Sequence, residues 1–162
     1  MSRLSVVLPA YNEELMVGKT CRVLHEVLSE AGISYELVIV DDGSKDKTWD
    51  EITKAGEKDM NILGVHFSRN FGKEAAVYAG LAQATGDVVA VMDCDLQHPP
   101  ETLISMYHLW EQGWEVIEGV KKSRGTESDG SMLYTSNGAG YVGPPVRLMA
   151  PPEIVVIDLV RK

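Results

Sequence analysis

Short apolar runs alternate along most of the chain with longer segments in which apolar residues recur at the spacing of an α-helix. The apolar runs have about the length of typical strands, and they cover residues 4–8, 36–40, 62–67, 88–92 and 116–120. The segments between them predict helices over residues 13–30, 45–58, 72–84 and 100–112. This alternation predicts an α/β fold, with a mostly parallel sheet and helices on both faces.

The last part of the chain differs in composition. Residues 129–162 carry three acidic and three basic side chains, so the whole net charge of −9 lies in residues 1–128. They also hold four of the seven prolines, and four glycines fall between Gly130 and Gly143, which is typical of loops. We therefore expect one folded domain over 1–128, followed by a Gly/Pro-rich tail over 129–162 of unknown role with one late strand.

Composition narrows the class of protein. The 162 residues fit one domain, and 44% hydrophobic content is typical of a globular chain. The acidic charge argues against binding of nucleic acid and favours a bound cation. No apolar run approaches the roughly 18 residues of a transmembrane segment, and no secretory signal is recognised, so we expect a cytoplasmic chain, at most peripheral at a membrane. Cys21 and Cys94 lie too far apart in the sequence to indicate a disulfide framework or a zinc site.

Two aspartates separated by one residue follow the fourth predicted strand. Asp93 and Asp95 can both approach a single cation, and such close like charges are unfavourable without one. Oxygen ligands suit Mg²⁺ or Mn²⁺, and Mg²⁺ commonly combines one or two carboxylates with substrate phosphates. The pair therefore indicates a metal-bridged diphosphate. Capping of the following helix is the structural alternative, and Cys94 is interpreted as a small packing residue.

Polar residues also follow the first two strands. The run Asp41-Asp42-Gly43-Ser44 is typical of a tight turn, but a turn needs only one of its aspartates. The other is free to accept hydrogen bonds from a base or a ribose. Tyr11 lies in a loop, where its ring can stack on a nucleobase, although a place in the core is the alternative. Glu13 is either a ligand-facing acid or an acid favoured by the helix dipole.

A positive cluster follows the last strand of the first 128 residues. It consists of Lys121, Lys122 and Arg124. One interpretation is a solvent-exposed strand end. The other is a clamp for an anionic group, in which Arg124 binds a phosphate through two hydrogen bonds.

Four motifs in order resemble the family 2 glycosyltransferases. Within that family the chain is most similar to the polyprenyl-phosphate branch, which includes dolichol-phosphate mannose synthase and the bactoprenol glucosyltransferases. The motifs are VVLPAYNEE at 6–14, VDDGS at 40–44, RNFGK at 69–73 and MDCDLQHPPE at 92–101. The resemblance covers residues 3 to about 128 and implies the GT-A fold, an α/β domain that binds nucleotide-diphosphate sugars.

The resemblance also implies roles for individual residues. It places the nucleotide against Pro9, Tyr11, Asn12, Glu13, Asp41, Asp42, Lys73 and Asp93. It places Mg²⁺ or Mn²⁺ at Asp93, Asp95 and Gln97, and the acceptor phosphate at Lys121, Lys122 and Arg124. Asp95 and Arg124 are the implied catalytic residues.

The implied reaction is inverting transfer of a sugar, in cell-envelope glycan synthesis. The donor is a UDP- or GDP-linked sugar, and the acceptor is a polyprenyl phosphate or similar lipid phosphate at a membrane surface. Members of this branch continue well past Ser128, and residues 129–162 match no part of the family. The alternative is therefore a donor-binding fragment or pseudoenzyme that lacks the acceptor half and is inactive alone. A second copy of the chain could supply that half, and in this alternative the protein is a homo-oligomer.

Phosphoryl-transfer domains are a third class, because they use similar parallel sheets and fold alone does not exclude them. A phosphatase with an aspartate nucleophile is disfavoured, because the D-x-D pair follows the fourth strand and no earlier strand offers a better pair. A receiver domain is disfavoured because the acidic pair follows the second strand and the last strand lacks a lysine-proline signature.

Overall fold

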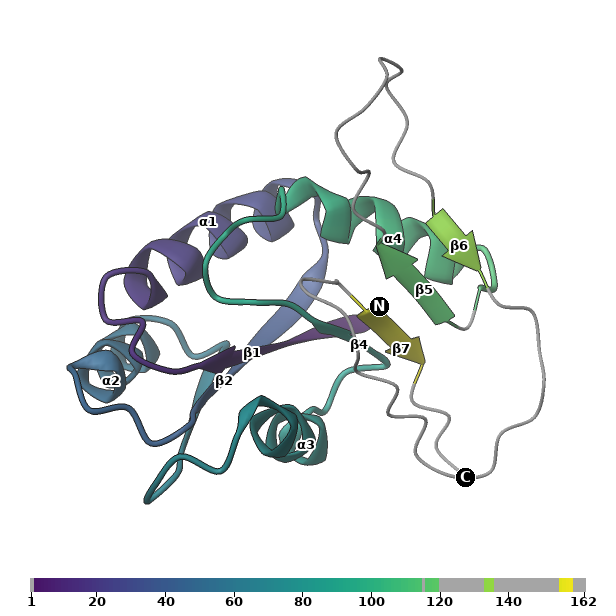
Figure 1. Ribbon diagram of the computed structural model, residues 1–162. Coiled ribbons are helices and arrows are strands. Elements are labelled where there is room, and N and C mark those ends of the chain that lie inside the picture. Colours follow the sequence, from purple (N-terminus) through teal and green to yellow (C-terminus); the bar gives the residue numbers. More distant parts are fainter. Residues whose placement is uncertain (1, 115, 120–132, 136–154, 159–162) are drawn as a thin grey trace, which may run out of the picture.

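The computed structural model describes residues 2–114, 116–119, 133–135 and 155–158. A central sheet lies between α1 and α4 on one side and α3 on the other (Figure 1). The elements in chain order are β1 (Arg3–Ala10), α1 (Val17–Glu30), β2 (Ser34–Asp41), α2 (Thr48–Lys58), β3 (Ile62–His66), α3 (Lys73–Gln83), β4 (Val88–Val91), α4 (Glu101–Glu111), β5 (Val116–Gly119), β6 (Leu133–Thr135) and β7 (Val155–Asp158). The predicted alternation of strands and helices is confirmed.

The described strands form one sheet in the order β3-β2-β1-β4-β7-β5-β6. Strands β1 to β4 pair in parallel. Strand β7 runs antiparallel to both β4 and β5, so β5 points the same way as β1 to β4, and β6 runs antiparallel to β5. Most of the described strands therefore share one direction, which confirms the mostly parallel sheet. The place of β7 between β4 and β5 is not evident from the sequence, because pairing between distant segments leaves no local pattern. The division of the chain at residue 128 stays a prediction.

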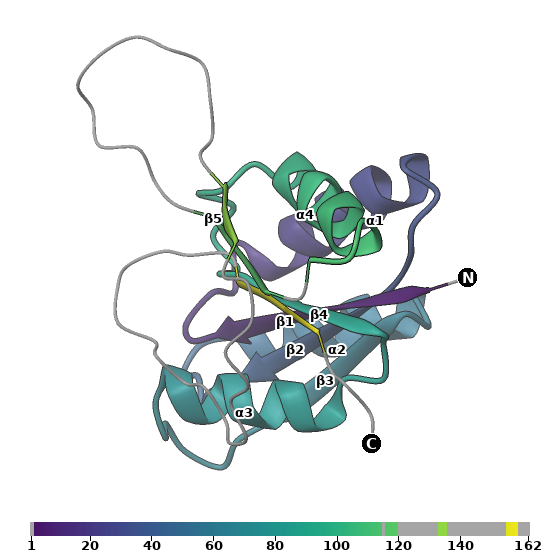
Figure 2. The ribbon, with the colours of Figure 1, turned by 90° about the vertical axis from the view of Figure 1, so that its right-hand side faces the viewer.

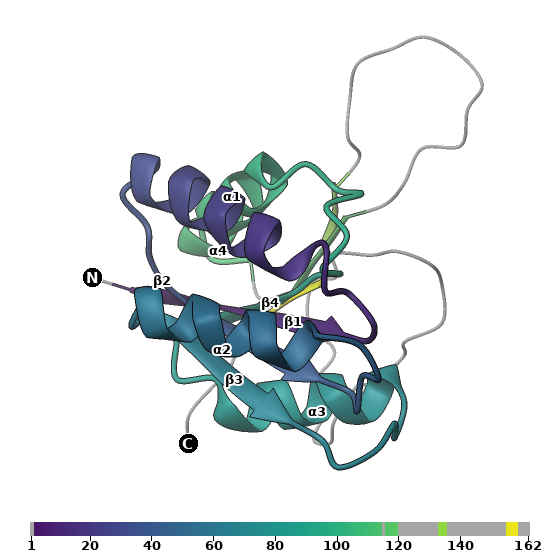
Figure 3. The same ribbon diagram turned by 90° about the vertical axis from the view of Figure 1, so that its left-hand side faces the viewer.

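Side chains of β1 alternate between the two faces of the sheet, as the geometry of a strand requires. Leu4, Val6 and Leu8 are buried in a core that includes residues of α1, α2 and α4. Val7 points the other way, into a second core that includes residues of α3. Figures 2 and 3 show α1 and α4 on the face of the sheet opposite α3. A strand covered on both faces must be apolar along its length, which explains why these strands are continuous apolar runs.

Helices α1 and α2 begin later than the sequence predicts, at Val17 instead of Glu13 and at Thr48 instead of Lys45. The Glu13 carbonyl accepts hydrogen bonds from the N–H groups of Met16 and Val17, both at 3.0 Å, which forms a separate turn before α1. The helices predicted from the sequence therefore include residues 13–16 and 45–47, which belong to loops in the structure. Within the described residues, no helix combines the length and the apolar character needed to cross a bilayer.

Glu36 is a buried acid on β2, only 7% exposed, and it ties together three segments of the chain. Its Oε1 accepts hydrogen bonds from the Ser5 hydroxyl at 2.5 Å and from the Thr85 N–H at 2.6 Å. Its Oε2 accepts the Thr85 hydroxyl at 2.8 Å and lies 3.5 Å from the Arg3 guanidinium. Burial acts to raise the pKa of Glu36, but these hydrogen bonds and the charge of Arg3 outweigh burial and hold the pKa below its ordinary value.

We expect Glu36→Gln to lower the free energy of unfolding at pH 7 by about 1–3 kcal/mol, because the amide cannot accept all the hydrogen bonds that the carboxylate accepts. The folded-state pKa of Glu36 is lowered, so the stability that its ionised form contributes is complete above the ordinary value of 4.5. That contribution is lost as the pH falls through the folded-state pKa. Urea denaturation of wild type and variant at a series of pH values should show a constant difference near neutral pH that shrinks in acid.

Glu57→Gln is the matched control. Glu57 is exposed on α2 and its side chain makes no hydrogen bond or ion pair within the described part of the chain, so its loss should cost less than about 0.5 kcal/mol at any pH. An equal loss in the two variants would contradict a special role for Glu36.

Candidate functional site

A cleft of about 230 Å³ opens at the carboxyl ends of β1, β2 and β4. Parallel strands end at the same edge of a sheet, so the loops that follow them meet there (Figure 3). The cleft is lined by Pro9, Ala10, Tyr11, Glu13, Asp42, Lys73, Asp93, Cys94 and Asp95. Most of the site residues expected from the sequence therefore surround one cavity, although they come from four separate loops.

Hydrogen bonds join the loop after β1 to the loop after β2. The Asn12 N–H donates to Ser44 Oγ at 2.9 Å, and Asn12 Oδ1 accepts the Lys45 N–H at 2.9 Å. The Glu13 N–H donates to Thr48 Oγ1 at 2.8 Å. Asn12 bridges the two loops and is not among the residues that line the cleft. Its side chain positions the loops in this structure.

Tyr11 and Glu13 both face the cleft. Tyr11 is 42% exposed, so the alternative of a core residue is wrong and its ring is available for stacking. Glu13 precedes α1 and is not part of its first turn. Burial raises the pKa of Glu13 above its ordinary value, and nearby carboxylates, Asp95 first among them, raise it further.

The two aspartates of the loop after β2 divide their tasks. Asp41 is fully buried, and its Oδ1 accepts the Ser44 N–H at 3.0 Å, which closes the turn. Its Oδ2 lies 2.7 Å from Nδ1 of His66, whose ring is stacked on Trp49. Asp41 therefore stabilises the conformation of the loop from its buried side. The second aspartate, Asp42, is the one that lines the cleft, as the turn argument allowed.

Asp42 also holds the loop between β3 and α3. Its carboxylate accepts the N–H groups of Phe71, at 2.8 Å, and Gly72, at 3.1 Å. Gly43 allows this contact, because it has a φ of 67° and a Cβ there would meet the carbonyl carbon of Arg69. The loop after β2 and the RNFGK motif thus pack backbone against backbone.

The Asp93-Cys94-Asp95 segment reaches the cleft from the end of β4. The Lys73 ammonium lies 2.5 Å from Asp93 Oδ1. Asp95 Oδ1 accepts the N–H of Gln97 at 3.1 Å. The helix-capping alternative is wrong, because α4 begins at Glu101 with Pro100 as its N-cap, while Asp95 accepts the Gln97 N–H outside the helix and Asp93 pairs with Lys73. The Gln97 side chain is exposed and is not among the residues that line the cleft.

Cys94 packs as expected from the sequence. It is 2% exposed, and its carbonyl accepts the Thr20 hydroxyl at 2.7 Å. Burial raises the pKa of the Cys94 thiol to about 12, so the thiol stays protonated near neutral pH. The two carboxylates beside it are the groups of this segment whose chemistry suits a cation.

The oxygen atoms in the cleft fit a divalent cation that takes some of its ligands from the protein and the others from a substrate. Among the described residues, no group of three or more His, Cys, Asp or Glu side chains is arranged to hold a metal by itself. Mg²⁺ commonly takes one or two carboxylates and completes its shell with phosphate oxygens and water. Asp93 and Asp95 provide that number of carboxylates at the cleft, and Glu13 and Asp42 add negative charge around them.

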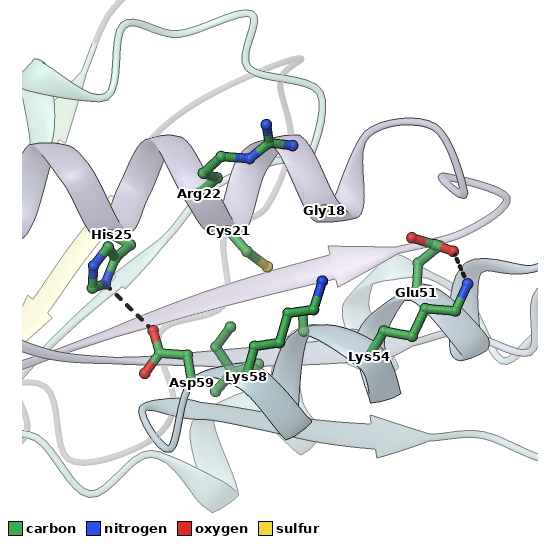
Figure 4. Close-up of a pocket in the computed structure, with 10 residues that line it drawn as sticks. Gly18, Cys21, Arg22, His25, Glu51, Lys54, Lys58 and Asp59 are labelled. Carbon is green, nitrogen blue, oxygen red and sulfur yellow. Dashed lines mark hydrogen bonds and ion pairs between the residues drawn. The ribbon is translucent and has the colours of Figure 1, made fainter.

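A larger hollow of about 570 Å³ lies elsewhere, between α1 and α2 (Figure 4). None of the residues expected for the site lines it. Its polar side chains are largely paired with one another, Lys54 with Glu51 at 2.6 Å and His25 with Asp59 at 3.5 Å. The smaller cleft is therefore the candidate site, because the acidic residues and the lysine expected for the site line it.

The positive cluster of Lys121, Lys122 and Arg124 lies outside the described residues, so its role stays a prediction. The sequence analysis missed the residues that hold the loops, among them Thr48 and His66. Asp46 belongs with them, since its carboxylate accepts the Thr48 N–H at 2.9 Å and the Glu14 N–H at 3.2 Å. An aspartate two residues before a threonine at a helix start was the available signal.

Comparison with known sequences identifies relatives over most of the chain. The sequence model of Glycosyl transferase family 2 matches residues 5–144, so the expectation that residues 129–162 match no part of the family is wrong for 129–144. A protein of Bacillus subtilis (strain 168) named uncharacterized glycosyltransferase YkcC is 40% identical over 124 residues, 76% of this chain and 38% of the relative. Undecaprenyl-phosphate 4-deoxy-4-formamido-L-arabinose transferase of Pseudomonas aeruginosa (strain LESB58) is 37% identical over 121 residues, 74% of this chain and 36% of the relative. The chain thus spans less than two fifths of the length of these relatives.

Solved structures share the fold. Mannosyltransferase PcManGT from Pyrobaculum calidifontis, in complex with GDP-Man and Mn²⁺, superposes with a TM-score of 0.65 and 25% identity over 75% of this chain and 36% of its own. Glucosyl-3-phosphoglycerate synthase from Mycobacterium tuberculosis, in complex with Mn²⁺, UDP and glucosyl-3-phosphoglycerate, gives 0.58 and 26% over 71% of this chain and 42% of its own.

The close approach of Gly43 to the backbone of residues 69–70 can be tested by substitution. We expect Gly43→Ala to lower the free energy of unfolding by about 2–4 kcal/mol, because the left-handed φ is strained and the new methyl group clashes with the backbone of residues 69–70. Urea denaturation measures this loss. Hydrogen exchange should also show that the Phe71 and Gly72 amides, which Asp42 holds, lose protection.

Gly32→Ala provides a matched control. Gly32 has a φ of 68°, close to that of Gly43, but a Cβ there would meet nothing within 4 Å. Its substitution should therefore cost only the strain, about 1 kcal/mol, and leave the Phe71 and Gly72 amides protected. Equal losses for the two variants would show that the contact between the loops is unimportant.

Proposed function

The chain belongs to glycosyl transferase family 2, and on that premise we propose that its cleft binds a nucleotide sugar together with a divalent cation. The donor is a UDP- or GDP-linked sugar, the cation is Mg²⁺ or Mn²⁺, and the sugar passes to a polyprenyl phosphate with inversion. The architecture that carries this cleft is the GT-A fold. The acceptor is proposed because one relative is named as an undecaprenyl-phosphate sugar transferase.

One observation carries the proposal. Four carboxyl groups and one ammonium line the cleft among the described residues, namely Glu13, Asp42, Asp93, Asp95 and Lys73. This excess of negative charge disfavours a diphosphate unless a cation binds between them. A divalent ion with a nucleoside diphosphate satisfies both requirements. GDP-Man with Mn²⁺ in one solved relative, and UDP with Mn²⁺ in the other, support the same pairing.

Each cleft residue has a task in this proposal. Asp93 and Asp95 hold the metal, with Gln97 beside them, and the metal supplies charge stabilisation on the leaving diphosphate. The Tyr11 ring stacks on the base, and Asp42 accepts hydrogen bonds from the base or ribose through the lone pairs that the Phe71 and Gly72 amides leave unused. Pro9 and Glu13 complete the wall of the nucleotide site.

Asp41 and Asn12 act on the nucleotide indirectly in this proposal. Asp41 is buried behind the cleft, and Asn12 bridges two loops, so each positions groups that touch the ligand. The Lys73 ammonium approaches the diphosphate from the start of α3. Asp41 and Asn12, which the sequence assigns to nucleotide binding, thus support that binding through the loops that they hold.

The acceptor side of the proposal rests on the residues beyond β5. Lys121, Lys122 and Arg124 hold the acceptor phosphate, and Arg124 and Asp95 flank the reacting groups. A phosphate is already anionic and nucleophilic near neutral pH, so the reaction needs no strong general base. A lipid phosphate acceptor also requires that the protein work at a membrane surface.

A second candidate function is donor binding without transfer. The observation that favours it is that Lys73 is the only cation among the described residues that line the cleft, and it is already paired with Asp93. In this case the cleft binds the nucleotide sugar, but the acceptor side must be supplied by further polypeptide or by another copy of the chain.

Titration calorimetry tests donor binding. We expect UDP, GDP or one of their sugars to bind in the presence of Mn²⁺, and Asp93→Asn or Asp95→Asn to weaken that binding by at least about tenfold, because each removes a metal ligand. Asp50→Asn is the control, since Asp50 is an exposed carboxylate on α2 away from the cleft. Absence of binding by every nucleotide, with and without metal, would refute the proposal.

Transfer is measured separately, with a radiolabelled nucleotide sugar and a short-chain polyprenyl phosphate in detergent. We expect labelled lipid product whose anomeric configuration is opposite to that of the donor, and we expect Asp95→Asn to abolish it. Donor binding without any labelled lipid would instead support the second candidate.

A further inference from the structure

Lys73 is paired with a residue that the proposed function gives to the metal. Its ammonium lies 2.5 Å from Asp93 Oδ1, and the two side chains are 57% and 24% exposed. Among the cleft-lining residues that the structure describes, Lys73 is the only cation. The ammonium therefore provides the positive charge that the carboxylates of the cleft require.

The backbone of Lys73 is held firmly while its side chain is long. Lys73 is the first residue of α3, and the N–H of the preceding Gly72 donates to Asp42. A lysine side chain has four rotatable bonds beyond such an anchor, and more than half of this one is exposed. The ammonium can therefore leave Asp93 and reach another anion in the same cleft without any movement of the helix.

A divalent cation and this ammonium cannot share Asp93 favourably. Like charges within a few ångströms repel, and a metal close to Asp93 would be close to the Lys73 ammonium as well. Exchange of one cation for the other at Asp93 relieves this repulsion. A diphosphate in the cleft offers Lys73 a second set of anionic oxygens, and the same diphosphate supplies ligands to the metal.

We propose that Lys73 competes with the divalent cation for Asp93, and that the diphosphate of the nucleotide removes this competition by drawing the Lys73 ammonium away. Lys73 is then a positioning residue that makes metal and nucleotide bind together, since each releases the partner that the other needs. The inference rests on the proposed function, because it takes Asp93 as a metal ligand and a nucleoside diphosphate as the occupant.

Binding measurements on the full chain test this competition. Mn²⁺ affinity is measured by electron paramagnetic resonance of free Mn²⁺, with and without saturating UDP or GDP, whichever binds the wild type. We expect Lys73→Gln to bind Mn²⁺ alone about threefold to fivefold more tightly than wild type, the range that a partly exposed ion pair can produce. The factor by which the nucleotide raises Mn²⁺ affinity should fall by a similar amount, because the variant has no Lys73 ammonium for the nucleotide to draw away from Asp93.

Two control variants separate competition from a general change of charge. Lys58→Gln removes the same charge from α2, away from the cleft, and should leave Mn²⁺ affinity as in wild type. Lys73→Arg keeps a cation in place and should retain weak binding of Mn²⁺ alone. Equal tightening in Lys58→Gln, or unchanged Mn²⁺ affinity in Lys73→Gln, would overturn the inference.

Crystal structures give a readout that does not depend on affinity. We expect the Lys73 ammonium on Asp93 in the protein alone, and on the phosphates once Mn²⁺ and the nucleotide are bound. Lys73 still paired with Asp93 in that complex would contradict the inference while leaving donor binding intact. If the wild type bound neither Mn²⁺ nor any nucleotide, both the inference and the proposed function would be wrong.

Discussion

The gathering of carboxyl groups at one edge of the sheet is the constraint to which the rest of the site responds. Like charges in a small cleft repel, and each carboxyl group is stabilised in its own way. Asp42 accepts backbone amides, Asp95 accepts the amide of Gln97, and Asp93 pairs with Lys73. Glu13 responds by a raised pKa. Negative charge remains after these contacts, and a bound cation is the natural partner for it.

The loops that carry these groups are held by hydrogen bonds and close packing between one loop and the next. Asn12 and Thr48 join the first two loops, and Asp42 and the approach at Gly43 join the second loop to the third. Backbone groups in loops must find partners when they leave the solvent, and here the partners belong to neighbouring loops. A cleft built in this way keeps its shape before any ligand arrives, which lowers the entropy that a ligand must overcome on binding.

Much of the fold could be predicted from the sequence, because both faces of the central strands are covered and most of their positions are therefore apolar. The positions of β1 to β5 and of the four helices agree with that pattern. Helix starts were less certain, since the segments before Val17 and Thr48 take their hydrogen bonds from another loop. Most of the cleft residues were also predicted, because polar residues at the ends of parallel strands must meet at one edge. The burial of Asp41 and the bridge that Asn12 forms between two loops were not evident, since a motif does not show which of its members face inward.

The sequence by itself determined the α/β class, the edge at which the cleft forms, and the acidic residue types that gather there. These properties depend on periodicity and on the residues at the carboxyl end of each strand, and both are local. Only the tertiary structure decided that β7 lies between β4 and β5, that Asp41 is buried while Asp42 lines the cleft, and that Lys73 reaches Asp93. Each of these depends on contacts between segments far apart in the chain, and such contacts are set by packing and hydrogen bonding, which leave no mark in the local pattern.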